Sequence, residues 1–210
     1  MEVLGITFGG VLIVLFAVIA AIVSVYNKFV TLKNLVEKGW SDLETALQRR
    51  YDLIGNLVET VKGYAQHEKE TLTEVIEARS KATEINIDAG NITADQMAQF
   101  SQVEAGLSGA LGKLFALAEQ YPDLKANTNF LDFQKELAVT EDQIKSHREF
   151  FNYKVTDYNT LRELFPSNII AKIFNFTKRD LFEVSDEDAM NAPKVNFRDS
   201  EKEDVSFKGE

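Results

Sequence analysis

A long apolar segment at the amino terminus constrains this chain more than any other feature. The first 26 residues read MEVLGITFGGVLIVLFAVIAAIVSVY, and no charged side chain occurs from Val3 to Tyr26. A helix of about 20 apolar residues spans the hydrocarbon core of a bilayer, whereas a helix on the surface of a soluble domain keeps one polar face. In a bilayer such a segment satisfies its own backbone N–H and C=O groups only as a helix. The sequence therefore predicts a transmembrane anchor over residues 1–26.

Two other interpretations of this segment are less favourable. A cleaved signal peptide has a basic amino-terminal region and an apolar core of roughly 7–15 residues. Here Glu2 is the only charged side chain before a longer apolar run, although Val18-Ile19-Ala20 resembles a cleavage site. A core helix of a soluble domain is disfavoured by the length of the run.

The lysines that flank the anchor predict its orientation. Lys28, Lys33 and Lys38 follow the segment, and nothing basic precedes it except the terminal amine. The positive-inside rule then places the amino terminus outside the membrane and residues 27–210 in the cytoplasm.

Composition excludes several classes of function. The formal net charge of −10 argues against binding to nucleic acid, or to an anionic membrane surface by general electrostatics. The chain has no cysteine, so it forms no disulfide, thiol nucleophile or thiolate metal site. Beyond the anchor, the rest of its 210 residues suffices for one domain with a real core.

Apolar residues recur at intervals of three and four after the anchor, which is the pattern of helices that pack on one another. The first stripe comprises Phe29, Leu32, Val36, Gly39, Leu43, Ala46, Leu53, Leu57 and Val61. The rhythm resumes over residues 72–82, and a straight helix from 29 to 82 would measure about 80 Å. No later helix is long enough to cover it. We therefore expect a turn near Gly55 or Gly63, and the sequence does not decide between them.

A second helix is predicted over residues 94–119, after a loop at 86–93. Thr93 and Gln96 have the spacing of a capping box. One face of this helix carries large apolar residues: Met97, Phe100, Val103, Leu107, Leu111 and Leu114. A second face carries small residues, among them Ala105, Gly109, Gly112 and Ala116. Glycine in a helix interior costs about 1 kcal/mol relative to alanine, so close packing by a neighbouring helix is the simplest compensation. A phosphate-binding loop is disfavoured, because no strand precedes the glycines and their spacing matches no P-loop.

The last long helix is predicted over residues 127–164, and Pro166 ends it. Its apolar seam comprises Phe130, Phe133, Leu137, Thr140, Ile144, His147, Phe151, Val155, Tyr158, Leu161 and Phe165. Residues 167–176 form a short apolar segment, for which a helix packed on the bundle is favoured over a partner-binding or membrane-touching element. Residues 177–210 are acidic and show no apolar period over 185–210, which is typical of a disordered tail.

Small residues also line one face of the anchor. Gly5 and Gly9 form a GxxxG motif, and Ala17 and Ala21 continue the same face. Such faces let membrane helices approach closely, so this one favours homo-oligomerisation. The alternative is that glycine and alanine are simply common in membrane helices.

Three stretches of the chain resemble the LemA family of bacterial membrane proteins. They are WSDLETALQRRYDLIGNLVETVKGYAQHE (40–68), LSGALGKLFALAEQYPDLKANTNFLDFQKEL (107–137) and YNTLRELFP (158–166). One departure is Gly55, where the family usually has proline. The resemblance implies one amino-terminal membrane helix and a cytoplasmic antiparallel helical bundle, and it supplies no enzymatic activity. It points to membrane zinc metalloproteases and other envelope proteins as partners.

No arrangement of residues predicts catalysis. His67 begins HEKE, which lacks the HExxH spacing of a zinc site, and His147 falls on the predicted packing seam. Arg49 and Arg50 are the most suggestive polar residues. A buried arginine needs a carboxylate partner, so an internal ion pair is favoured over an anion-binding site.

These patterns predict an all-α protein of the bacterial inner membrane. A single transmembrane helix (1–26) precedes an antiparallel long-helix, four-helix-type bundle (27–176) and an acidic tail (177–210). We expect a scaffold or adaptor that self-assembles and uses protein–protein contacts, without enzymatic activity or cofactor. The alternatives are a sensor that relays an envelope signal through its long helix, and a hydrolase, which lacks a catalytic constellation.

Overall fold

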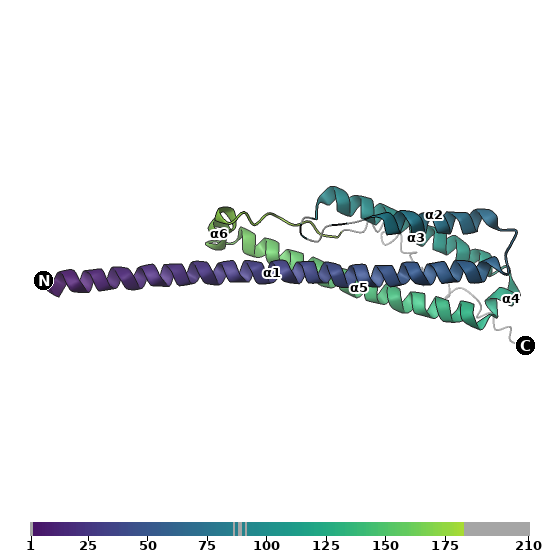
Figure 1. Ribbon diagram of the computed structural model, residues 1–210, viewed down its shortest axis with the longest axis horizontal. Coiled ribbons are helices and arrows are strands. Elements are labelled where there is room, and N and C mark those ends of the chain that lie inside the picture. The colour runs from purple at the N-terminus through teal and green to yellow at the C-terminus, as the bar shows by residue number, and fades with distance from the viewer. Residues whose placement is uncertain (1, 86, 88–89, 91, 183–210) are drawn as a thin grey trace, which may run out of the picture.

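The computed structural model describes residues 2–85, 87, 90 and 92–182, with side-chain surroundings from residue 9 onward. These residues form helices and no strand, which confirms the all-α class. The helices are α1 (Glu2–Lys62), α2 (Lys69–Glu84), α3 (Ala94–Ala118), α4 (Pro122–Lys125), α5 (Thr128–Glu163) and α6 (Ser167–Ile173). Figure 1 shows that the first part of α1 extends away alone, while the other helices lie along its second part.

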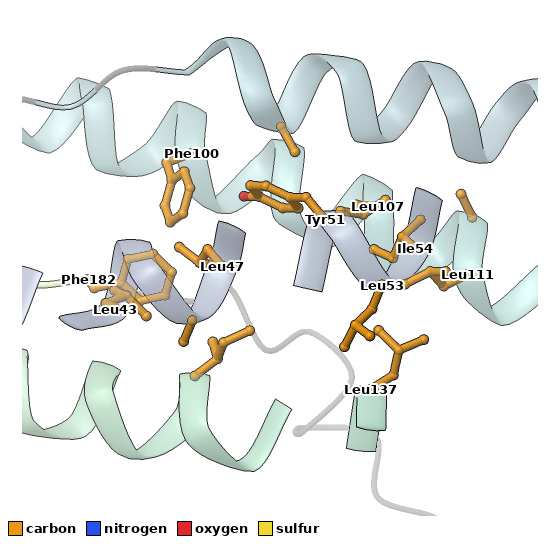
Figure 2. Close-up of a cluster of buried hydrophobic side chains, with 14 of the residues drawn as sticks. Leu43, Leu47, Tyr51, Leu53, Ile54, Phe100, Leu107, Leu111, Leu137 and Phe182 are labelled. Atoms are coloured by element: carbon orange, nitrogen blue, oxygen red, sulfur yellow. The ribbon is translucent and has the colours of Figure 1, made fainter. Parts of the chain in front are cut away.

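The second part of α1 is the central element of the packed region. The predicted stripe is buried, apart from partly buried Leu32. A second face is buried as well, through Trp40, Leu47, Tyr51, Ile54 and Val58. Figure 2 shows side chains of both faces among residues of α3 and α5. Burial on two sides explains why α1 carries more apolar residues than one stripe requires.

Helix α5 packs along α1 through contacts that follow a simple order. Phe29 meets Tyr158 with ring centroids 5.9 Å apart, and Trp40 meets Phe151 at 5.6 Å. Farther along α1, Arg49 Nη2 lies 3.6 Å from Glu136 Oε2. Residue numbers on α5 therefore fall as those on α1 rise.

Helix α1 continues without interruption through Gly55 and ends at Lys62, just before Gly63. The backbone N–H groups of Tyr64 and Ala65 each donate to the Val61 carbonyl over 2.9 Å, and α2 begins at Lys69. Of the two expected positions, the turn at Gly63 is correct and the one at Gly55 is wrong. The nearest neighbour of a Cβ atom at Gly55 would be the Arg79 guanidinium, at 3.5 Å, which is an ordinary van der Waals contact.

The ends of the later helices follow from local residues. Thr93 and Gln96 form the predicted capping box at the start of α3. Asn127 caps α5, because its Oδ1 accepts from the Phe130 N–H over 3.0 Å. Pro122 starts the short α4, and α3 already ends at Ala118.

The predicted seam of α5 is buried or partly buried except at its last residue. Phe165 is exposed, because α5 ends at Glu163 and the chain turns at Pro166. Inclusion of Phe165 in the seam was therefore wrong. The following α6 contacts both α1 and α5, in agreement with a packed helix at 167–176.

Residues 177–182, which we name the strap, continue beyond α6 along the packed region. The Asn152 amide pairs with the backbone of Phe182, donating to its carbonyl over 2.9 Å and accepting from its N–H over 2.8 Å. Asn159 pairs in the same way with the backbone of Arg179. Both Arg179 and Phe182 are buried. The packed region thus extends past the predicted boundary at 176, and the predicted disorder over 185–210 lies outside the described residues.

Candidate functional site

A buried charge joins three helices at the centre of the packed region. Arg50 of α1 is only 4% exposed. Its Nη1 donates to Glu141 of α5 over 2.9 Å, and its Nη2 donates to Glu104 of α3. We name Arg50, Tyr51, Glu104 and Glu141 the Arg50 cluster. The arrangement confirms an internal ion pair at Arg50 rather than an anion-binding site.

Tyr51 completes the Arg50 cluster and ties in the remaining long helix. Its hydroxyl donates to Glu104, and its carbonyl accepts from Arg79 Nε of α2 over 2.6 Å. Burial raises the pKa of Tyr51 to about 12, against the opposing effect of the Arg50 charge. The phenol is protonated at neutral pH, as an unperturbed tyrosine also is. Nη1 and Nη2 of Arg50 are occupied by the two glutamates, whereas the buried Nε has no hydrogen-bond partner among the described residues. Such a cluster connects α1, α3 and α5 through one buried guanidinium and one buried phenol.

Sequence reasoning identified Arg50 but missed its partners. Glu104 and Glu141 lie among many carboxylates, and no local pattern separates these two from solvated ones. The only available signal is the arginine itself, whose place between buried residues demands a partner.

An open groove of about 440 Å³ runs beside the Arg50 cluster, between α3 and α5. Leu111 and Phe115 line it from α3, and Leu137 lines it from α5. Its polar part comprises Arg50, Ser108, Gln134 and Glu141. Because Gly112 also lines the groove, it adjoins the small-residue face of α3.

The small-residue face of α3 is open in this structure. Ala105, Gly109, Gly112 and Ala116 are all exposed. A Cβ atom built on Gly109 or Gly112 would meet nothing within 4 Å. No helix in the described part of this chain packs closely on this face, and close packing by a helix of another protomer stays a prediction. The face that α3 turns inward is the large apolar one, with Leu107 and Leu114 fully buried.

The closely packed glycine is Gly39 of α1, which the sequence placed only on the apolar stripe. A Cβ atom there would lie 3.1 Å from Phe150 Cδ1 and 3.3 Å from Phe151 Cα. Gly39 therefore allows α5 to approach α1 where their aromatic residues meet.

The apolar first part of α1 has no protein cover in the described region. The helix is long and apolar enough to cross a membrane, with a mean hydropathy of 2.6 in its most apolar window. Side chains from Val11 to Val23 are exposed on all faces. Gly9, Ala17 and Ala21 have no helix against them, while Gly5 lies outside the residues whose side-chain surroundings are described. Packing between two anchors stays a prediction.

Potential metal ligands are scattered. No group of three or more His, Cys, Asp or Glu side chains among the described residues could hold a metal ion. His67 is exposed, and His147 is partly buried.

Comparison with known proteins gives a consistent set of relatives. The sequence model of the LemA family matches residues 39–197. Protein LemA of Metamycoplasma hominis is 29% identical over 175 residues, which cover 83% of this chain and 74% of that protein. Magnetosome protein MamQ 2 of Paramagnetospirillum magneticum is 27% identical over 184 residues, covering 80% of this chain and 68% of the relative. Magnetosome protein MamQ of Magnetospirillum gryphiswaldense is 28% identical over 185 residues, with the same coverage.

Proposed function

The chain belongs to the LemA family, and from this premise we propose that it is a membrane-anchored scaffold or adaptor of the bacterial cell envelope. In this proposal the protein self-assembles and works through protein–protein contacts. Its long helices α1, α2, α3 and α5 act as one antiparallel, four-helix-type bundle that the anchor holds at the inner membrane.

The observation that carries this proposal is the double role of α1. One uninterrupted helix is apolar and uncovered in its first part and forms the centre of the packed region in its second part. A membrane span joined without a flexible linker holds the bundle at a fixed height, as a scaffold requires. The predicted orientation, with the bundle in the cytoplasm, is part of the proposal.

The surface of α3 supports contacts with other proteins. The exposed small-residue face and the adjoining groove offer a place where a helix of another chain can approach closely. We assign this surface first to a second copy of the chain and then to other envelope proteins, with membrane zinc metalloproteases as one class.

A scaffold also fits the chemistry of the site better than an enzyme does. The Arg50 cluster uses Nη1 and Nη2 of Arg50 and the Tyr51 hydroxyl to hold helices together, which supports this proposal. Three of the relatives are named for the magnetosome rather than for a reaction, which supports an assembly role. We accordingly propose no catalytic activity and no cofactor.

The second candidate function is a signal relay. It is favoured by the length of α1, because a single helix of 61 residues links the anchor to the far end of the bundle. A relay requires that a movement of the anchor change the packing around Trp40 and Arg50, whereas a scaffold requires no such change.

Light scattering on the full-length protein in mild detergent tests self-assembly. The scaffold proposal expects an oligomer, and comparison with a chain that begins at Asn27 shows whether the anchor is needed. Gly109→Leu is the surface variant, because a Cβ atom at Gly109 meets nothing within 4 Å and the larger side chain projects from the open face of α3. Loss of the oligomer in this variant would place the contact on α3. A monomer for both chain lengths would overturn self-assembly.

A further inference from the structure

A patch of exposed apolar side chains surrounds the turn from α5 to α6. It consists of Leu164, Phe165, Ile169, Ile173 and Phe174, and we name it the α6 patch. Phe165 is 79% exposed and Ile173 is 66% exposed. Contiguous apolar patches of this kind mark surfaces that contact a protein or a membrane, whereas single exposed apolar residues are ordinary.

The geometry of α6 shows that the patch is not a poorly packed core. Ser167, Ile170 and Ala171 form the inward face of α6 and are buried. The Ser167 hydroxyl donates to the Leu161 carbonyl over 2.6 Å, which fixes the turn against the end of α5. Ile169 and Ile173, four residues apart on the opposite face, point away from the bundle.

The position of the α6 patch along α1 identifies what covers it. Phe174 meets Tyr26 with ring centroids 4.8 Å apart, and Phe176 stacks on Phe29 at 4.6 Å. Tyr26 is the last residue of the predicted anchor. Figure 1 shows α6 beside α1 at the level where the uncovered part of α1 begins. The patch therefore lies at the height where α1 leaves the bilayer.

The residues around the patch have the chemistry of a membrane interface. Tyr26 and the exposed phenylalanines are aromatic, and aromatic rings concentrate at the boundary between headgroups and acyl chains. Lys172 within α6 is exposed, and so are Lys28, two residues after Tyr26, and the acidic Glu163, one residue before Leu164. Long lysine side chains can extend from such a site to the headgroups while apolar neighbours lie deeper.

We propose that the α6 patch inserts into the interfacial layer of the bilayer that α1 crosses, so that the bundle touches the membrane at a second place. The inference rests on the proposed membrane anchoring. Insertion is driven by burial of apolar side chains rather than by net charge, so it takes place on uncharged phosphatidylcholine as well as on anionic lipid. Two attachment points fix the tilt of the bundle, which one helix alone leaves free.

Spin labels at single introduced cysteines test the insertion, because the natural chain contains no cysteine. The full-length protein is reconstituted into phosphatidylcholine vesicles, and the access of each label to oxygen and to a water-soluble nickel chelate is measured. Oxygen concentrates in lipid and the chelate in water, so their ratio reports immersion. The three sites are Ile169→Cys in the patch, Phe16→Cys in the anchor, and Val139→Cys on α5. Val139 is the matched control, because it is 52% exposed and Ile169 is 51% exposed.

The proposal expects the oxygen-to-chelate ratio at Ile169 to exceed that at Val139 severalfold and to approach that at Phe16. Equal ratios at Ile169 and Val139, with a high ratio at Phe16, would overturn the insertion and leave the anchor intact. Loss of access to both reagents at Ile169, or broadening by a neighbouring spin, would show that protein covers the patch and would also overturn it. A low ratio at Phe16 would instead contradict membrane anchoring itself.

Discussion

At the scale of single residues, Arg50 shows how a charge inside a helical bundle determines which helices meet. Its two glutamate partners come from α3 and α5, which lie on different sides of α1. Removing one partner of a buried pair is far more costly than replacing both, because the survivor keeps its charge without compensation. The charged pair, rather than the arginine alone, therefore determines which helices pack together.

Replacement Arg50→Met should lower the free energy of unfolding by about 3–5 kcal/mol, because it leaves Glu104 partly buried and unpaired. The double replacement Arg50→Met with Glu104→Leu should recover much of the loss. Chemical denaturation in mild detergent, followed by circular dichroism, measures both. Additive losses in the double variant would contradict a coupled pair. Arg49→Met, which breaks only an exposed contact with Glu136, is the control and should change stability little.

Two glycines with opposite surroundings give a second prediction. Gly39→Leu should destabilise the protein by about 1–3 kcal/mol, because Phe150 and the backbone of Phe151 leave no room for a side chain. Gly109→Ala should stabilise it by about 0.5–1 kcal/mol, because the site is open and alanine is the better helix former. Thermal unfolding of the two variants compares them directly. A stabilising Gly39→Leu or a destabilising Gly109→Ala would show that the packing of these helices differs from that described.

Whether the structural role of a residue can be predicted from the sequence depends on how far along the chain its contact partners lie. The capping box of Thr93 and Gln96 could be found in the sequence, because both partners lie within one turn. The role of Gly39 could not, because it depends on the approach of α5 from far along the chain. The glycines of α3 leave a related question open: a small-residue face indicates that close approach by a helix is allowed, and it does not say whether that helix belongs to this chain or to another copy.

At the scale of elements, the helices were predictable and the strap was not. Apolar periodicity gives α3 and α5 to within a residue or two, since each buries one continuous stripe. The strap has no such period. It is held by side-chain amides of Asn152 and Asn159 that pair with its backbone, and this pairing leaves no pattern in the strap itself.

Shortening the chain provides a test of the strap. A chain that ends after Phe182 keeps every described contact and should unfold like the full-length protein. A chain that ends after Phe176 should lose about 2–3 kcal/mol, chiefly because the buried ring of Phe182 is missing. Phe182→Ala in the full-length chain should reproduce most of this loss. Equal stability of the two shortened chains would show that the strap contributes nothing to the bundle.

At the scale of the whole molecule, α1 divides the protein into an uncovered apolar part and a packed part. The first part has the length and composition of a membrane span, and the match to the LemA family model begins later, at residue 39. The lysines at the junction predict which side of the membrane receives the packed part, and no contact within the protein bears on that choice.

Topology can be measured with a reporter enzyme that is active only in the periplasm. Fused after residue 210, the reporter should be inactive, because the three lysines after the anchor favour retention of the bundle in the cytoplasm. A fusion to a reporter that is active only in the cytoplasm is the positive control. Activity of the periplasmic reporter would reverse the orientation and with it the compartment of the partners.

The continuity of α1 also fixes the rotation of the anchor relative to the packed region about the helix axis. A helix turns by about 100° per residue, and α1 has no break between the anchor and the bundle. The azimuth at which the anchor presents Gly9 and Ala17 is therefore locked to the azimuth at which the bundle presents α3. When two anchors meet through that face, their bundles acquire a defined rotational phase. One residue inserted between Tyr26 and Phe29 would reset this phase by nearly a third of a circle, and within the protein it would disturb the contacts of Tyr26 with Phe174 and Phe176.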